Sequence, residues 1–99
     1  MQNKERPGKQ KYMVLVIYDI IDNRRRQRLA KLLKGYGYRI QKSAFECLLT
    51  NRKYLKLVDE IEKLKEDDDL IKVYKLHSDV EIRTYGDMKR VEEDEIIFI

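Results

Sequence analysis

The chain has 99 residues, a net charge of +4 and one cysteine. This length suits one domain, and a single cysteine excludes an internal disulfide bond, so we expect a cytoplasmic protein in a reducing compartment. No apolar run approaches the roughly 20 residues that a transmembrane helix needs, which argues against a membrane protein. Charged residues make up 40% of the chain but nearly balance, so the placement of the basic residues must indicate any nucleic-acid partner.

The first 12 residues differ in composition from the segment that follows them. Residues 1–12 carry the only proline, a glycine and many charges, which is typical of a disordered extension, so the domain is expected to span residues 13–99. Met13–Ile20 is a run of mostly Val, Ile, Leu and Tyr. It predicts a central strand that is covered or flanked on both faces.

A helix is predicted from Asp22 or Asn23 to Lys34. Asp22 is a typical N-cap residue, and the two glycines that follow the helix favour its termination. Four apolar side chains share one face at helical spacing: Leu29, Leu32, Leu33 and Tyr36.

A strand pair, a second helix and a further strand follow. Tyr38–Gln41 and Ala44–Leu49 are predicted to be strands joined by a tight turn, and a helix capped by Thr50 or Asn51 runs to about Lys65. Five apolar residues form its buried stripe: Tyr54, Leu57, Val58, Ile61 and Leu64. The acidic residues 66–69 are predicted to form a solvated turn before a strand at residues 70–76.

This order predicts an α+β fold, a ferredoxin-like βαββαβ sandwich with two helices on one face of a four-stranded antiparallel sheet. The chain ends on a strongly apolar segment at residues 95–99, which would be poorly placed in water. We expect this segment to form an additional strand that pairs with a sheet edge of a partner subunit, so that the chain forms a homodimer.

Asp19 stands near the carboxyl end of the first predicted strand. A carboxylate there could hold a metal ion or act on a phosphate, although a capping or salt-bridged role is the alternative. One carboxylate is too few for a hard cation such as Mg²⁺. A two-fold dimer would supply the second by symmetry.

Four arginines follow within five positions of the chain. Helical spacing places Arg24, Arg28 and Lys31 in solvent, with Arg25 near the apolar side and Arg26 at its border. Basic residues in a first turn oppose the helix dipole, and their clustering suits phosphate oxygens. A solvated charged face is the alternative.

Three segments taken together resemble a known family: "VLVIYDIIDNRRRQRLAKLL", "GYGYRIQKSAFECLLT" and "IKVYKL". The family is that of the second core CRISPR-associated (Cas) protein, the small ferredoxin-fold nuclease of spacer acquisition, and the resemblance covers residues 13–99. It implies a homodimer in which the last strand crosses to the partner sheet. It also implies a magnesium- or manganese-dependent endonuclease that cuts RNA or double-stranded DNA.

The resemblance also implies roles for individual residues. The metal-binding catalytic aspartate of the family matches Asp19, and its nucleic-acid-binding positions match Tyr18, Arg26, Arg28, Arg39 and Phe45. Two Asp19 carboxylates would hold one ion at the dimer axis, and the ion would activate water. The three arginines would grip flanking phosphates, and Phe45 or Tyr18 would pack or stack against the nucleic acid.

Two other functions remain open at this point. Proteins of this family also act as a non-catalytic scaffold that bridges two dimers of the CRISPR integrase and binds the duplex to be inserted. A ferredoxin-fold regulatory module for a small molecule is a third possibility, but it gives no account of the arginines. The single histidine, His77, is predicted to be a surface or packing residue, and Cys47 a core residue.

Overall fold

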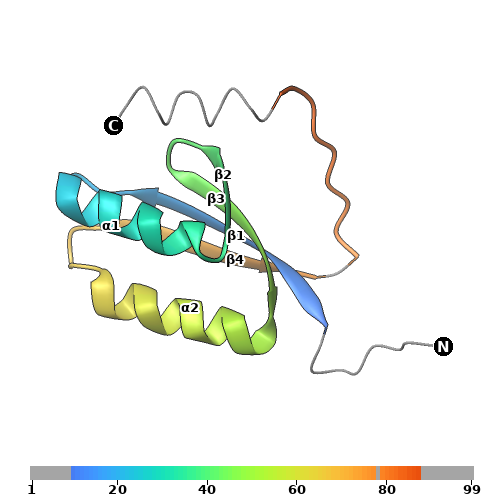
Figure 1. Cartoon of the computed structure of the whole chain (residues 1–99), viewed down its shortest axis with the longest axis horizontal. Helices are drawn as coiled ribbons and strands as arrows, with labels where there is room; N and C mark the ends of the chain where they lie inside the picture. Colours follow the sequence, from blue (N-terminus) through green and yellow to red (C-terminus); the bar gives the residue numbers. More distant parts are fainter. Residues whose placement is uncertain (1–9, 78, 88–99) are drawn as a thin grey trace.

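The computed structural model of the chain describes residues 10–77 and 79–87. Its elements follow the predicted βαββαβ order. They are β1 (Lys11–Asp19), α1 (Asn23–Lys34), β2 (Gly37–Gln41), β3 (Ala44–Thr50), α2 (Asn51–Leu64) and β4 (Leu70–Leu76). Both helices lie on the same side of the sheet, as Figure 1 shows, so the predicted ferredoxin-like α+β fold is confirmed.

The four strands form one antiparallel sheet in the order β2-β3-β1-β4. The most apolar strand, β1, is therefore central and pairs with β3 on one side and β4 on the other. In this register Asp19, the last residue of β1, lies opposite Leu70, the first residue of β4. The carboxyl end of β1 and the start of β4 thus meet at one end of the sheet.

The core lies between the sheet and the helices. Alternate residues of β1 point into it, and Val14, Val16 and Tyr18 are at most 3% exposed. The opposite face of the sheet is open: Ile17 is 39% exposed and Leu48 is 58% exposed. The prediction of a central strand covered or flanked on both sides is met by flanking, because β3 and β4 pair with β1 on its two sides while the helices described cover only one face of the sheet.

Local rules account for both helices. The Asp22 side chain accepts a hydrogen bond from the Arg25 N–H at 2.8 Å and caps α1, and Thr50 caps α2 in the same way through the Lys53 N–H at 3.3 Å. The predicted apolar stripes pack inward. Their buried members are Leu29 and Leu33 in α1 and Leu57 and Ile61 in α2.

The limits of the domain differ slightly from those predicted. β1 begins at Lys11, because Lys11 and Tyr12 already pair with Thr50 and Leu49 of β3. Two residues assigned to the disordered extension therefore belong to the sheet. Residues 1–9 and the predicted exchanged strand at 95–99 lie outside the described residues. None of the helices described is long and apolar enough to cross a membrane.

Candidate functional site

Asp19 is exposed at the end of β1, on the face of the sheet that the helices leave open. Its ladder partner Leu70 is also exposed, at 54%. Within the described ranges, no three His, Cys, Asp or Glu side chains gather into a metal-binding group. An exposed carboxylate fits a divalent cation that keeps most of its water ligands, but the described part of one chain gathers no group of acids around Asp19.

Arg26 holds the backbone that follows Asp19. Its Nη1 donates hydrogen bonds to the carbonyl oxygens of Ile20, at 2.9 Å, and of Ile21, at 3.2 Å, and its Nη2 donates to the Asn23 side chain. The guanidinium is therefore engaged in fixing the turn between β1 and α1. This differs from the expectation that Arg26 grips a phosphate, because both terminal nitrogens already have acceptors within the chain.

The hairpin between β2 and β3 brings Arg39 close to two aromatic rings. The Arg39 guanidinium lies 5.2 Å from the centroid of the Phe45 ring, which stacks on the Tyr18 ring at 6.5 Å. Arg39 Nη1 and the Tyr18 hydroxyl both donate to the carbonyl oxygen of Lys42, at 2.8 and 3.3 Å. Burial raises the pKa of Tyr18, while the nearby charges of Arg39 and Arg26 act in the opposite direction.

The two aromatic rings are core residues. Phe45 is 0% exposed and Tyr18 is 3% exposed. In this conformation neither ring can stack on a nucleotide base, so the expected stacking role does not fit the structure. The resemblance matched these positions by residue type, whereas their burial depends on the helices that pack above β1 and β3.

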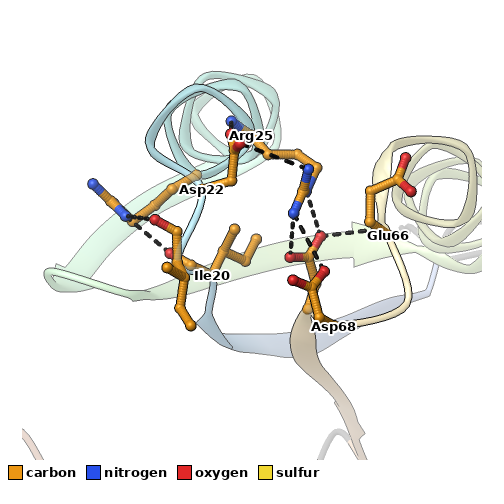
Figure 2. Close-up of polar contacts among 8 residues, drawn as sticks. Ile20, Asp22, Arg25, Glu66 and Asp68 are labelled. Carbon is orange, nitrogen blue, oxygen red and sulfur yellow. Dashed lines mark hydrogen bonds and ion pairs between the residues drawn. The ribbon is translucent and has the colours of Figure 1, made fainter.

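The acidic turn before β4 is solvated as predicted at residues 66–68, which are exposed, but the Asp69 side chain is buried. Arg25 reaches from the first turn of α1 to Asp69, with Nε 2.7 Å from Oδ2 and Nη2 3.0 Å from Oδ1 (Figure 2). The Asp69 side chain is 1% exposed and also accepts the Glu66 N–H at 2.9 Å. Hydrogen bonds from Arg25 hold the pKa of Asp69 below its ordinary value, although burial opposes this shift.

The remaining arginines of the cluster face solvent. Arg24, Arg28 and Lys31 are exposed along the outer side of α1, as helical spacing predicted, and α1 contains no acidic residue. Among the residues described, Arg24 and Arg28 form no ion pair. Arg24 was not among the expected binding residues, although its i, i+4 spacing from Arg28 was the signal that pairs the two on one face.

The predicted residues therefore fall into separate groups. Arg26 and Arg39 both lie near the Tyr18 hydroxyl, while Asp19 lies on the opposite face of the sheet. Arg28 belongs to neither group. With Arg24 and Arg25 it lines an open groove of about 590 Å³ between α1 and the end of α2, and that groove also contains Glu60 and Glu66.

Known proteins share both the sequence and the fold. The model of the family "CRISPR associated protein Cas2" matches residues 12–84. The chain is similar to the "CRISPR-associated endoribonuclease Cas2" of Mycobacterium tuberculosis, with 48% identity over 88 residues, 89% of this chain and 78% of that protein.

Solved structures give the same result. A hypothetical protein from Thermus thermophilus superimposes with a TM-score of 0.67 at 38% identity, covering 78% of this chain and 95% of that one. A chain of a partial Cas6-RT-Cas1–Cas2 complex superimposes with a TM-score of 0.58 at 28% identity, covering 69% of this chain and 81% of that one. Because the family model matches most of the chain and the fold matches solved structures of related sequence, the chain belongs to the CRISPR-associated Cas2 family.

Proposed function

We propose that this chain is an endonuclease of CRISPR spacer acquisition that hydrolyses phosphodiester bonds in RNA or double-stranded DNA, with Asp19 as its catalytic residue. The observation that carries the proposal is the exposed Asp19 carboxylate at the end of the central strand, in a family whose relatives are named endoribonucleases. A cytoplasmic location, where transcripts and the genome are accessible, is part of the proposal.

A homodimer is the second part of the proposal. The open face of the sheet carries exposed apolar side chains, namely Ile17, Leu48, Leu70 and Tyr74. Exposed apolar side chains on one face of a sheet favour association, and a second copy of the chain can cover them with the same residues. Asp19 lies on this face, so a two-fold axis close to the end of β1 brings two carboxylates together. The segment at 95–99 would then pair with an edge of the partner sheet, whose two edge strands are β2 and β4.

Magnesium or manganese is the cofactor in this proposal, held by the two Asp19 carboxylates and water. When bound, the ion supplies a Lewis acid and lowers the pKa of a water ligand. The chain itself does the rest: Arg26 fixes the turn beside Asp19 through the carbonyl groups of Ile20 and Ile21, and Arg28 offers a guanidinium for the phosphates of the substrate.

The test is cleavage of labelled RNA and labelled duplex DNA by the purified protein, with magnesium or with a chelator. Wild type should cut only with the metal, and Asp19→Asn, which keeps the shape of the side chain but removes its charge, should abolish cutting. Asp59→Asn on α2 is the matched control and should cut like wild type, because that carboxylate forms an exposed ion pair with Lys63. Cutting that survives Asp19→Asn contradicts the proposal.

A non-catalytic scaffold is the second candidate, and the exposed outer side of α1 favours it. Arg24, Arg28 and Lys31 can bind the backbone of a duplex without cleaving it, and a chain of the same fold is part of a Cas6-RT-Cas1–Cas2 complex. In this role the Cas1 integrase is the protein partner.

Duplex binding as a function of salt tests the scaffold role. The double substitution Arg24→Ala and Arg28→Ala should weaken binding and reduce the salt slope, d log K/d log[salt], by about 2. Arg52→Ala, an exposed arginine on α2, is the control and should leave the slope within about 0.5 of wild type. An unchanged slope in the double variant would remove α1 from the binding surface. Loss of cutting in Asp19→Asn with unchanged duplex affinity would show that the two functions are separate.

A further inference from the structure

We propose that Arg25 and Asp69 form a positioning pair for Asp19: their ion pair fixes the turn between β1 and α1 against the start of β4, so that the Asp19 carboxylate is held in place. The inference concerns how this chain presents Asp19 and rests on the proposed function for its catalytic consequence. Neither residue touches the substrate in this account.

The Asp69 carboxylate accepts three hydrogen bonds from other residues of the chain. It accepts hydrogen bonds from Arg25 Nε at 2.7 Å and from Arg25 Nη2 at 3.0 Å, a side-on bidentate arrangement that fixes orientation as well as distance. The Glu66 N–H adds a third hydrogen bond at 2.9 Å, and the Glu66 carbonyl accepts the Asp69 N–H at 3.0 Å. With its side chain 1% exposed, Asp69 is a buried acid of this turn and differs in this from the exposed Asp68.

The positions of Arg25 and Asp69 in the chain link their ion pair to Asp19. Asp69 directly precedes Leu70, and Leu70 is the ladder partner of Asp19. Arg25 stands in the first turn of α1, on the same element that begins directly after the β1–α1 turn. The ion pair therefore connects the two segments next to Asp19. One segment is the turn that leads from Asp19 to Arg25, and the other is the start of β4, where Asp69 precedes Leu70.

Two arginines anchor this turn from different sides. Arg26 binds the carbonyl groups of Ile20 and Ile21 from within the turn, and Arg25 ties the helix start to the neighbouring strand. Figure 2 shows the Arg25 side chain pointing from α1 towards the turn that carries Glu66 and Asp68, with the Asp22 carboxylate next to Arg25. Asp22 joins the network weakly, 3.9 Å from Arg25 Nη1, while it caps the helix.

The proposed dimer explains why the Asp19 carboxylate has to be held in a fixed position. Two carboxylates from different subunits can share one ion only if each is placed to within about 0.5 Å, and groups behind the ligands supply that precision. An ion pair whose two members lie 44 positions apart in the chain is suited to this task, because it fixes Asp19 relative to the sheet and to the helix at once.

Cross-linking measures the position of residue 19 without using activity. In Asp19→Cys dimers, oxidised glutathione should convert the two facing thiols into one disulfide bond, while Cys47, which is 1% exposed, stays protected. Adding Asp69→Asn should slow this cross-linking by about tenfold or more, the usual effect of removing a group that orients a ligand. Asp59→Asn added to Asp19→Cys is the matched control and should leave the rate unchanged.

The outcomes are distinct. Equal cross-linking rates with and without Asp69→Asn overturn the positioning role. Absence of cross-linking in Asp19→Cys alone instead contradicts the proposed dimer geometry. The positioning role of Arg25 and Asp69 is then tested by hydrogen exchange. In that measurement Asp69→Asn should raise the exchange rates of the amides at residues 20–26 by about tenfold while those of α2 stay unchanged; equal rates throughout overturn the inference.

Arg25→Lys guards against a variant that simply unfolds. It keeps the positive charge and the long aliphatic stem but cannot form the bidentate contact with Asp69. A positioning role predicts that Arg25→Lys lowers kcat for cleavage with little change in KM, whereas a purely stabilising role predicts normal kcat in the folded fraction.

Discussion

Replacing Phe45 separates a core residue from one that contacts nucleic acid. The ring is 0% exposed and lies between the Arg39 guanidinium and the Tyr18 ring, so its removal leaves a cavity inside the domain. A buried Phe→Ala change costs about 3–5 kcal/mol of unfolding free energy. A domain of this length has about 5–15 kcal/mol in total, so Phe45→Ala should lose a large part of its stability.

Phe45→Leu is the informative variant, because it keeps most of the volume and should cost less than about 1.5 kcal/mol. Urea unfolding followed by circular dichroism measures this loss, with an expected midpoint shift of about 1 M or less. Nucleic-acid affinity is then measured on the folded protein at fixed salt. Since the ring does not reach solvent, affinity should change by less than about twofold.

The opposite result would refute this reasoning. A ring that stacks on a base contributes about 1–3 kcal/mol to binding, so its loss would weaken binding by about fivefold or more. If Phe45→Leu leaves the urea midpoint unchanged and weakens binding to that extent, the ring leaves the core when nucleic acid binds.

Three further predictions follow from the packing. Gly37→Ala should destabilise the sheet by about 1–3 kcal/mol or more in urea unfolding, since the new Cβ would lie 2.0 Å from the carbonyl oxygen of Glu46; unchanged stability would contradict the close approach of β2 and β3. Cys47, whose pKa is raised to about 11 by burial and by the charge of Glu46, should react with a thiol reagent at pH 8 only as fast as the domain opens, so rapid labelling of folded protein would be contrary evidence. The pKa of Asp69 lies below its ordinary 3.8 in the folded state, so its stabilisation is complete above about pH 5 and lost as pH falls through 3.8 and below; Asp69→Asn should therefore show a weaker loss of stability in acid, and an acid profile as steep as that of wild type would argue against the role of this group.

Much of the fold follows from local signals in the sequence. Asp22 and Thr50 cap their helices because their short oxygen-bearing side chains reach a free backbone N–H, which requires only neighbouring residues. The stripe of Leu57 and Ile61 follows from helical spacing alone. Strand β4 begins and ends where alternation placed it, at residues 70–76.

The local surroundings of several residues could not be predicted from the sequence, because they depend on contacts with other parts of the folded chain. Asp69 looked like a solvated acid because its partner, Arg25, lies 44 positions away. Arg26 looked like a phosphate ligand because its spacing says nothing of the Ile20 and Ile21 carbonyl groups that it binds after folding. The burial of Phe45 likewise depends on tertiary packing, which residue type does not encode.

The position of Asp19 was better predicted than its surroundings. Strand alternation alone set it on the face opposite Tyr18, and the structure leaves it exposed there. Alternation alone could not predict that this face of the sheet is left uncovered by the helices, because that depends on both helices lying on the other side of the sheet. That open apolar surface is the feature that makes a paired arrangement of two aspartates a reasonable proposal.

Mixed dimers test the shared site most directly. Wild type and Asp19→Asn subunits are combined in known ratios, allowed to exchange, and assayed for cleavage at saturating magnesium. If both carboxylates serve one site, an equal mixture retains about one quarter of the wild-type activity, because only dimers with two intact aspartates cut. Retention of about one half, in proportion to the wild-type subunits, would mean that each subunit cuts alone and would contradict the shared site.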